Sequence, residues 1–301
     1  MNFGPFIEVV LGGMMAGVLY SLVALGFVLI FKASGVFNFA QGAMVLFAAL
    51  ALVTLVKKGI PLPLAMLIAT AIMVVLAILI ERLVLRPLVN QEGIILFLAT
   101  FGLTYFLEGF GQILFGSDVH QLDIGMPKEP RILFESTFPG GILINPEDLI
   151  AAVIAALLVG FLAIFFQKTT VGRALRAVAD DHQAAQSVGI PLNHIWVIVW
   201  SVAGFVALIA GMVWGSKLGV QFSLTQVALK AIPVVILGGF TSVPGAIVGG
   251  LIIGVGEKLA EVYLGPVIGG GIENWFAYAL ALVFLLFRPE GLFGERLIDR
   301  V

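Results

Sequence analysis

The feature that most constrains this chain is the recurrence of apolar stretches of about 20 residues, the length that a helix needs to cross the hydrocarbon core of a bilayer. A backbone surrounded by lipid must satisfy its own hydrogen bonds, and a helix does so within one segment. The sequence therefore predicts an all-α integral membrane protein. Continuous spanning helices are expected at 6–31, 36–56, 61–80, 94–115, 149–166, 194–215 and 272–287.

A further apolar stretch, 226–256, is interrupted by Gly238-Gly239 and by Pro244-Gly245. Broken helices of this kind frame substrate sites in many transporters. The stretch is predicted to be a re-entrant hairpin or two short spans, and a single kinked helix is the alternative. With it, residues 1–301 make one transmembrane domain of about eight helices.

The composition excludes several classes of function. Of the residues, 60% are hydrophobic and 11% charged, whereas soluble domains carry about 25% charged residues. The net charge of −2 gives no basic surface for nucleic acid, and the absence of cysteine removes disulfides, thiolate metal sites and cysteine nucleophiles. The three histidines lie far apart in the sequence. We therefore expect no metal, no catalytic residue and no enzyme activity, and lipid as the surrounding medium.

The distribution of Lys and Arg predicts the orientation, because these residues favour cytoplasmic loops. Three basic clusters are placed in the cytoplasm, and the acid-rich loop 116–148 is then periplasmic. Lys57 and Lys58 are an exception to this assignment. The basic residues of the three clusters are Arg82, Arg86, Lys168, Arg173, Arg176, Arg288, Arg296 and Arg300.

Residues 167–193 form a polar segment between two apolar spans, on the predicted cytoplasmic side. Thr169-Thr170 can begin a helix, and Gly189 with Pro191 can end it. Between them apolar residues recur at helical spacing, which predicts a short amphipathic helix. Such a helix either docks into a groove of another protein or lies on the membrane, where Asp180 and Asp181 would be repelled by anionic lipid.

The segment GRALRAVA at 172–179, followed by Ala184-Ala185 and Gly189-Ile190, resembles the coupling loop of bacterial ABC importer permeases. Gln183 stands where the general pattern has Glu. This resemblance implies that the segment contacts an ATPase subunit. The residues implied are Gly172, Arg173, Arg176, Asp180, Asp181, Ala184, Ala185 and Gly189.

Three other stretches resemble one branch of that family, the permeases for branched-chain amino acids and their relatives for urea and short amides. They are NFAQG at 38–42, the interrupted segment 236–246, and RPEGLFG at 288–294. The resemblance implies a multi-pass protein of the bacterial inner membrane. It also implies a second homologous permease subunit, two cytoplasmic ATPase subunits and a periplasmic solute-binding protein.

The sequence contains no Gly-x-x-x-x-Gly-Lys-Ser/Thr phosphate loop. We therefore expect that the chain binds no cofactor and that ATP is used by partner subunits. The leading prediction is the permease of an ATP-driven importer for branched-chain or other small amino acids. The alternatives are a permease for urea or short amides, and a secondary carrier or channel, which would need intramembrane ionisable residues.

Polar residues inside the predicted spans are candidates for the solute path, because they are costly in hydrocarbon. Hydrogen bonds between helices, or to their own helix in the case of the threonines, are the alternative. Lys230 is expected to extend outward, and Glu108 and Glu257 to lie near an interface. The candidates for the path are the polar residues Asn38, Gln41, Thr100 and Thr104, together with Gly238 and Gly239 at the break in the stretch 226–256.

Overall fold

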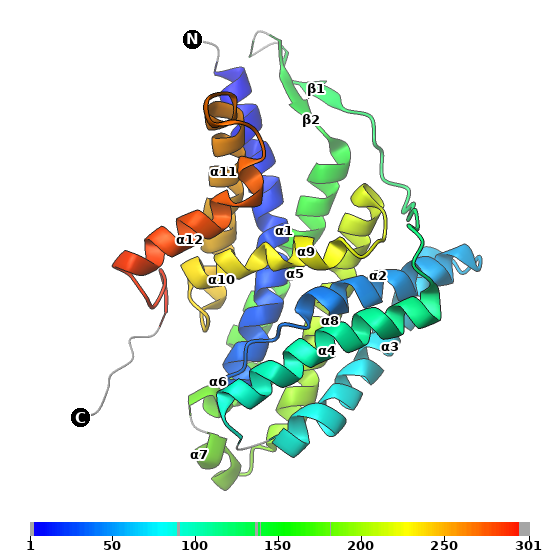
Figure 1. The fold of residues 1–301 in the computed structure, drawn as a ribbon, viewed down its shortest axis with the longest axis vertical. Coiled ribbons are helices and arrows are strands. Elements are labelled where there is room, and N and C mark those ends of the chain that lie inside the picture. The colour runs from blue at the N-terminus through cyan, green and yellow to red at the C-terminus, as the bar shows by residue number, and fades with distance from the viewer. Residues whose placement is uncertain (1–2, 89–90, 136–137, 139, 181, 295–301) are drawn as a thin grey trace. The chain divides into compact units, whose positions relative to one another are not determined.

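The computed structural model describes residues 3–88, 91–135, 138, 140–180 and 182–294, and its fold is helical (Figure 1). Arg296 and Arg300 of the third basic cluster lie outside these residues. In the described part of the chain, six helices are long and apolar enough to cross a membrane. They are α1 (Gly4–Ser34), α3 (Leu62–Ile80, continued to Leu88 by a π turn and a 3₁₀ turn), α4 (Gly93–Phe115), α5 (Pro146–Lys168), α8 (Leu192–Leu218) and α11 (Val243–Ile268).

Shorter elements complete the fold. The remaining apolar helices are α2 (Gln41–Lys57), α9 (Leu224–Leu229), α10 (Ala231–Gly238) and α12 (Phe276–Phe287). A polar pair of helices, α6 (Thr170–Asp180) and α7 (His182–Ser187), lies between α5 and α8. Strands β1 (Arg131–Leu133) and β2 (Ile142–Ile144) form an antiparallel hairpin in which Ile132 pairs with Leu143.

The seven continuous helices expected from hydropathy are confirmed, with two changed beginnings. The helix expected at 36–56 begins only at Gln41, because the chain is irregular from Gly35, whose φ of +69° ends α1. The last span begins with a 3₁₀ turn at Ile272–Asn274 before α12. The molecule is therefore the predicted multi-pass membrane protein, with about eight spans when the short helices are included.

The interrupted stretch 226–256 is a helical hairpin and not one kinked helix. Helices α10 and α11 pack against each other, and the backbones of Gly238 and Gly245 meet so closely that a Cβ on either would overlap the other. Ser242 begins α11 by accepting a hydrogen bond from the Gly245 N–H at 3.0 Å. Gly238 and Gly245, one from each interruption noted in the sequence, thus make the turn possible.

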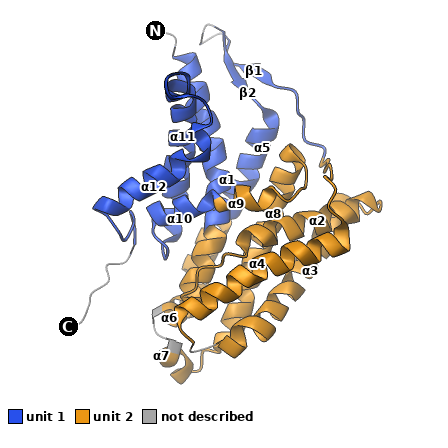
Figure 2. Cartoon of the chain, viewed as in Figure 1, with its two compact units in different colours: residues 1–24, 125–160, 230–301 blue, residues 25–124, 161–229 orange. Residues whose placement is uncertain are grey.

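The chain divides into two compact units (Figure 2). Unit 1 contains residues 1–24, 125–160 and 230–301, and unit 2 contains residues 25–124 and 161–229. In unit 1, α1 packs on α11 through glycines: a Cβ on Gly17 would lie 2.5 Å from the Gly250 carbonyl oxygen, and a Cβ on Gly13 2.6 Å from the Val255 Cα. Small residues allow this approach, as is common between membrane helices.

Unit 2 is built around α2, which contacts α3, α4, α8 and α9. Every residue of α2 from Gln41 to Val53 is buried. This burial explains why α2 is apolar on all sides, since a helix surrounded by other helices has no polar face. By contrast, α3 and α4 direct many apolar side chains outward, among them Leu67 (67% exposed) and Ile113 (83% exposed), as a lipid environment requires.

Candidate functional site

The polar segment after α5 is helical over Thr170–Asp180 (α6) and His182–Ser187 (α7), in agreement with the helix predicted there. Residue 181, between them, lies outside the described residues. The predicted start is confirmed, because Thr169 Oγ1 accepts a hydrogen bond from the Gly172 N–H at 3.2 Å. The predicted end is confirmed too, because Gly189 has a φ of +86°, which favours glycine.

The segment is amphipathic, as its spacing predicted. Leu175, Val178 and Ala185 are buried, with at most 3% of each exposed. Arg173, Ala184 and Gly189 are exposed. The backbone of Asp180 ends α6, and Asp181 falls at the position that is not described. The segment therefore has one face packed on the protein and one face available to a partner.

Helix α6 is attached to the end of α5 by two of the predicted contact residues. Arg176 Nη1 donates a hydrogen bond to the Phe166 carbonyl oxygen at 2.8 Å. A Cβ on Gly172 would overlap that same carbonyl. Terminal helix carbonyls lack partners within their own helix, and Arg176 supplies one. Arg176 and Gly172 therefore hold α6 against the end of α5.

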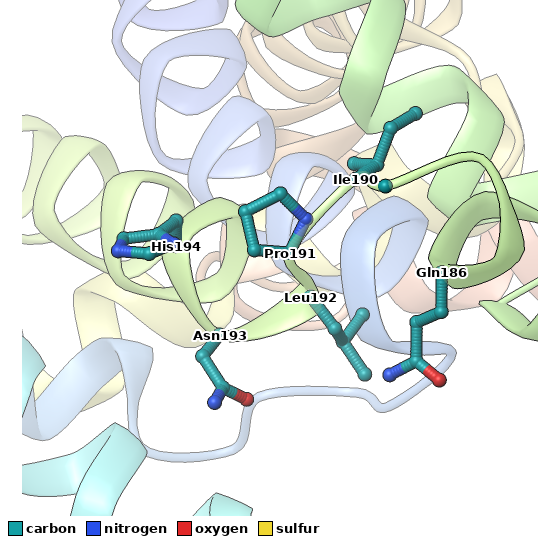
Figure 3. A pocket seen from close by; sticks show the side chains of 7 residues that line it. Gln186, Ile190, Pro191, Leu192, Asn193 and His194 are labelled. Atoms are coloured by element: carbon teal, nitrogen blue, oxygen red, sulfur yellow. The ribbon is translucent and has the colours of Figure 1, made fainter.

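A surface pocket of about 310 Å3 lies where α7 passes into α8 (Figure 3). Gln186 lines it from α7, and Asn193 and His194 line it from the start of α8. Beside it, the apolar side chain of Val188 is 77% exposed. The exposed face thus offers an apolar projection next to a hollow lined by both polar and apolar residues. Its role in contacting an ATPase stays a prediction.

A second polar site lies before α2. Asn38 and Gln41 are both fully buried. The Asn38 Nδ2 donates to Gln41 Oε1 at 3.2 Å, and its Oδ1 accepts from the Ala40 N–H at 3.1 Å. Gln41 Nε2 donates to the Ala203 carbonyl of α8 at 3.3 Å. These contacts are hydrogen bonds within and between elements, one of the two roles expected. Contact with a solute stays a prediction.

The hydroxyl groups of Thr100 and Thr104, both in α4, make different hydrogen bonds. Thr100 Oγ1 lies 3.1 Å from the Phe37 carbonyl oxygen and 3.0 Å from that of Phe97, and it accepts from the Phe39 N–H at 3.4 Å. Thr104 Oγ1 donates to the carbonyl of Thr100 at 3.1 Å, within its own helix. Thr100 therefore fixes the irregular backbone before α2, whereas Thr104 lines a cavity beside α4.

The break at Gly238-Gly239 is joined to the C-terminal motif. The Leu292 N–H donates to the Leu237 carbonyl at 2.8 Å, and the Phe293 N–H to the Gly238 carbonyl at 3.1 Å. Gly239 has a φ of +104°. The break at Gly238-Gly239 and the C-terminal motif, which are distant in sequence, are thus hydrogen-bonded to each other in unit 1. Their place on a solute path stays a prediction.

One polar cluster was missed by the sequence analysis. Lys230, expected to extend outward, forms an ion pair with Glu257, with Nζ 2.9 Å from Oε1. The Tyr20 hydroxyl donates to the same oxygen at 3.3 Å. Glu257 is 2% exposed, so its carboxylate is buried within the protein. The helical hairpin brings together two charges that are 27 residues apart, and no sequence spacing indicated this.

The chain is similar to known membrane transport proteins over nearly its whole length. Residues 9–288 match the model of a family described as the branched-chain amino acid transport system permease component. The high-affinity branched-chain amino acid transport system permease protein BraD of Pseudomonas aeruginosa is 28% identical, over 98% of both chains. LivH of Escherichia coli, described in the same words, is 27% identical over 100% of this chain and 99% of its own.

A solved structure has a similar fold. It is PsaBC from Streptococcus pneumoniae in complex with Fab, with a TM-score of 0.51 and 13% sequence identity. The alignment covers 94% of this chain and 92% of the other. At this identity the likeness concerns the helical fold alone.

Proposed function

The chain belongs to the family of permease components of branched-chain amino acid transport systems, and from that premise we propose that it carries branched-chain amino acids through the inner membrane as one subunit of an ATP-driven importer. The observation that carries this proposal is the match over residues 9–288, which includes the segment 167–193, the polar residues around Asn38 and the break at Gly238-Gly239. Relatives with that stated activity align over their whole length. Urea and short amides are not favoured by these names.

We propose that the subunit works with a second homologous permease, two cytoplasmic ATPase subunits and a periplasmic solute-binding protein. ATP would be bound by the ATPase subunits, since this sequence has no phosphate loop. The loop 116–148 would face the periplasm and the segment 167–193 the cytoplasm. The positive-inside distribution of Lys and Arg supports this orientation.

The exposed face of α6 and α7 is proposed to dock on an ATPase subunit. Val188 and Ala184 would enter a groove of the partner, with Arg173 at the edge. Helices that dock in this way bury apolar projections in a groove. Closure of the ATPase pair would then move α6, and the contacts of Gly172 and Arg176 with the end of α5 would transmit this movement to the membrane-spanning helices.

The solute path is proposed to pass the two interrupted helices. The hydrogen bonds of Asn38, Gln41 and Thr100 would keep the irregular backbone before α2 in place, and Gly238 and Gly239 would do the same for the hairpin. Thr104 would face the path itself. Irregular backbone at membrane depth occurs where it is buried in protein or lines a cavity, which supports both assignments.

The experiment exchanges one of two exposed valines for aspartate. Val188→Asp places a charge on the proposed docking face, and co-purification of the ATPase subunits should fall about tenfold or more, as for a central interface residue. Val119→Asp is the matched control, because Val119 is 53% exposed and follows α4. It should leave co-purification unchanged.

Uptake of radiolabelled leucine in cells provides the second measurement. Val188→Asp should abolish most of the uptake together with the ATPase association. Equal co-purification of ATPase with both variants would contradict the docking proposal. Uptake that continues after ATP depletion would instead support a secondary carrier or channel.

A further inference from the structure

A cavity of about 440 Å3 lies in unit 2, between α4, the irregular segment before α2, and the segment 222–229 that contains α9. Small-molecule sites usually have volumes of roughly 300–1,000 Å3. The α4 residues that line the cavity follow the spacing i, i+3, i+4 and i+7, which places them on one helix face. These residues are Phe101, Thr104, Tyr105 and Glu108.

One part of the wall is aromatic and apolar. The rings of Phe39 and Phe101 have centroids 6.2 Å apart, and those of Phe101 and Tyr105 are 5.2 Å apart. Phe222 and Leu229 line the cavity from the opposite segment. Such a surface suits an aliphatic side chain, and its ring faces also attract a cation.

Glu108 is the one charged side chain among the residues that line the cavity. It lies seven residues before the end of α4, about 10 Å along the helix at 1.5 Å per residue. In the described part of the chain, no Lys, Arg or His forms an ion pair with it. A carboxylate inside a membrane span is costly unless a cation balances it. The Glu108 carboxylate is therefore available to a positively charged group of a ligand.

Thr225 provides a hydrogen-bonding group on the other wall. It is 7% exposed, and its Oγ1 has no hydrogen-bond partner among the described residues. Its Cγ2 lies towards α2, 3.0 Å from where a Cβ of Gly42 would be. Buried hydroxyls are almost always paired. A hydroxyl left without a partner beside a cavity is consistent with a ligand that completes it.

We propose that this cavity is a membrane-embedded binding site for a zwitterionic aliphatic amino acid, an inference that rests on the proposed function. The Glu108 carboxylate accepts hydrogen bonds from the ligand's ammonium group. The Thr225 hydroxyl donates to its carboxylate. Phe39, Phe101 and Leu229 surround the aliphatic side chain. The site selects for both charges of the ligand as well as its apolar body.

The absence of natural cysteines allows a direct test by site-specific labelling. Ser223→Cys places a single thiol in the cavity wall, and Ser117→Cys places one on the exposed segment after α4. Each full-length chain is reconstituted in lipid nanodiscs with the subunits that co-purify with it. A methanethiosulfonate reagent then labels the thiol with and without L-leucine.

L-leucine above its dissociation constant should slow labelling of the Ser223→Cys thiol about threefold or more, as an occupied site excludes the reagent. Labelling of the Ser117→Cys thiol should not change. The protection should disappear when Glu108→Gln is added, and 4-methylpentanoate, which lacks the ammonium group, should give none. If Ser223→Cys does not fold, Gln226→Cys, also in the cavity wall, takes its place.

Two results would overturn the inference and leave the proposed function intact: no protection by leucine in a chain that supports leucine uptake, or full protection in the Glu108→Gln variant. A chain that takes up no leucine, with its ATPase and binding protein present, would contradict the proposed function itself. In cells, Glu108→Gln should lower leucine uptake about tenfold while ATPase co-purification stays normal. Val188→Asp should lose both.

Discussion

The cluster around Asn38 and Gln41 in unit 2 and the cluster around Lys230 and Glu257 in unit 1 both lie where a helix is interrupted. The first is neutral, and its amide groups find partners in the backbone and in each other. The second is charged, and the Oε2 of Glu257 has no hydrogen-bond partner among the described residues. The two clusters therefore fix irregular backbone by different physical means.

The difference matters because burying charge is costly. An ion pair in a low-dielectric interior recovers the cost of desolvation only when its geometry is good and its remaining lone pairs are satisfied. The neutral cluster avoids that cost, so it can hold its segment rigidly. The charged cluster joins the junction between α9 and α10 to α11 through a single ion pair. We infer that the neutral cluster is the stronger constraint and the charged one the more sensitive to substitution.

Lys230→Met should have the largest effect on stability. It leaves the buried Glu257 carboxylate without its cation, and breaking a buried pair in this way costs about 3–5 kcal/mol. The measurement is the free energy of unfolding in mixed micelles, from a titration with a denaturing detergent. Glu257→Gln should cost less, because Lys230 is 22% exposed and its long side chain can reach a more polar region.

The double variant provides the control. Lys230→Met combined with Glu257→Gln has no buried charge and retains an acceptor for the Tyr20 hydroxyl. It should recover at least about half of the loss seen with Lys230→Met, since neutral replacements of buried pairs are well tolerated. A double variant as unstable as Lys230→Met would show that packing, and not charge, sets the stability of this cluster.

Gln41→Leu should have an intermediate effect. The change keeps a similar volume but removes the acceptor for Asn38 and the donor to the Ala203 carbonyl. Unpaired buried groups of this kind cost about 1–3 kcal/mol. Gln112→Leu is the matched control on the exposed face of α4, where the same exchange should change the free energy of unfolding by about 0.5 kcal/mol or less. Equal effects of the two exchanges would contradict the role assigned to the neutral cluster.

The helices could be predicted from sequence because lipid leaves the backbone few alternatives. The start of α2 could not be predicted, because hydrogen bonds from side chains decide it. Val36, Phe37 and Phe39 are as apolar as the residues of α2, so hydropathy extended the helix to 36. In the structure Asn38 bonds to the Ala40 N–H and Thr100 to the Phe39 N–H. Side chains thus replace the helical hydrogen bonds, and one of them comes from a distant helix.

In the candidate sites, too, local features could be predicted from the sequence, whereas contacts between distant segments could not. Thr169 and Gly189 indicated the limits of the polar segment, because capping is local. That Arg176 binds the end of α5 could not be predicted, since it depends on how α6 folds back. The pairing of Lys230 with Glu257 depends on the hairpin between α10 and α11. Contacts that depend on tertiary structure follow no fixed spacing in the sequence, so the sequence did not predict them.

The smallest effect on stability is expected for Thr104→Val, which tests how the backbone beside the neutral cluster is held. The Thr104 hydroxyl donates only to a carbonyl of its own helix, and this carbonyl can also accept the ordinary helical hydrogen bond. The free energy of unfolding should therefore change by about 0.5 kcal/mol or less. Thr100→Val, an equally conservative exchange one turn away, should cost about 1–3 kcal/mol, because the Phe39 N–H loses its acceptor. If both valines are equally tolerated, the Thr100 hydroxyl plays no part in fixing the irregular backbone before α2.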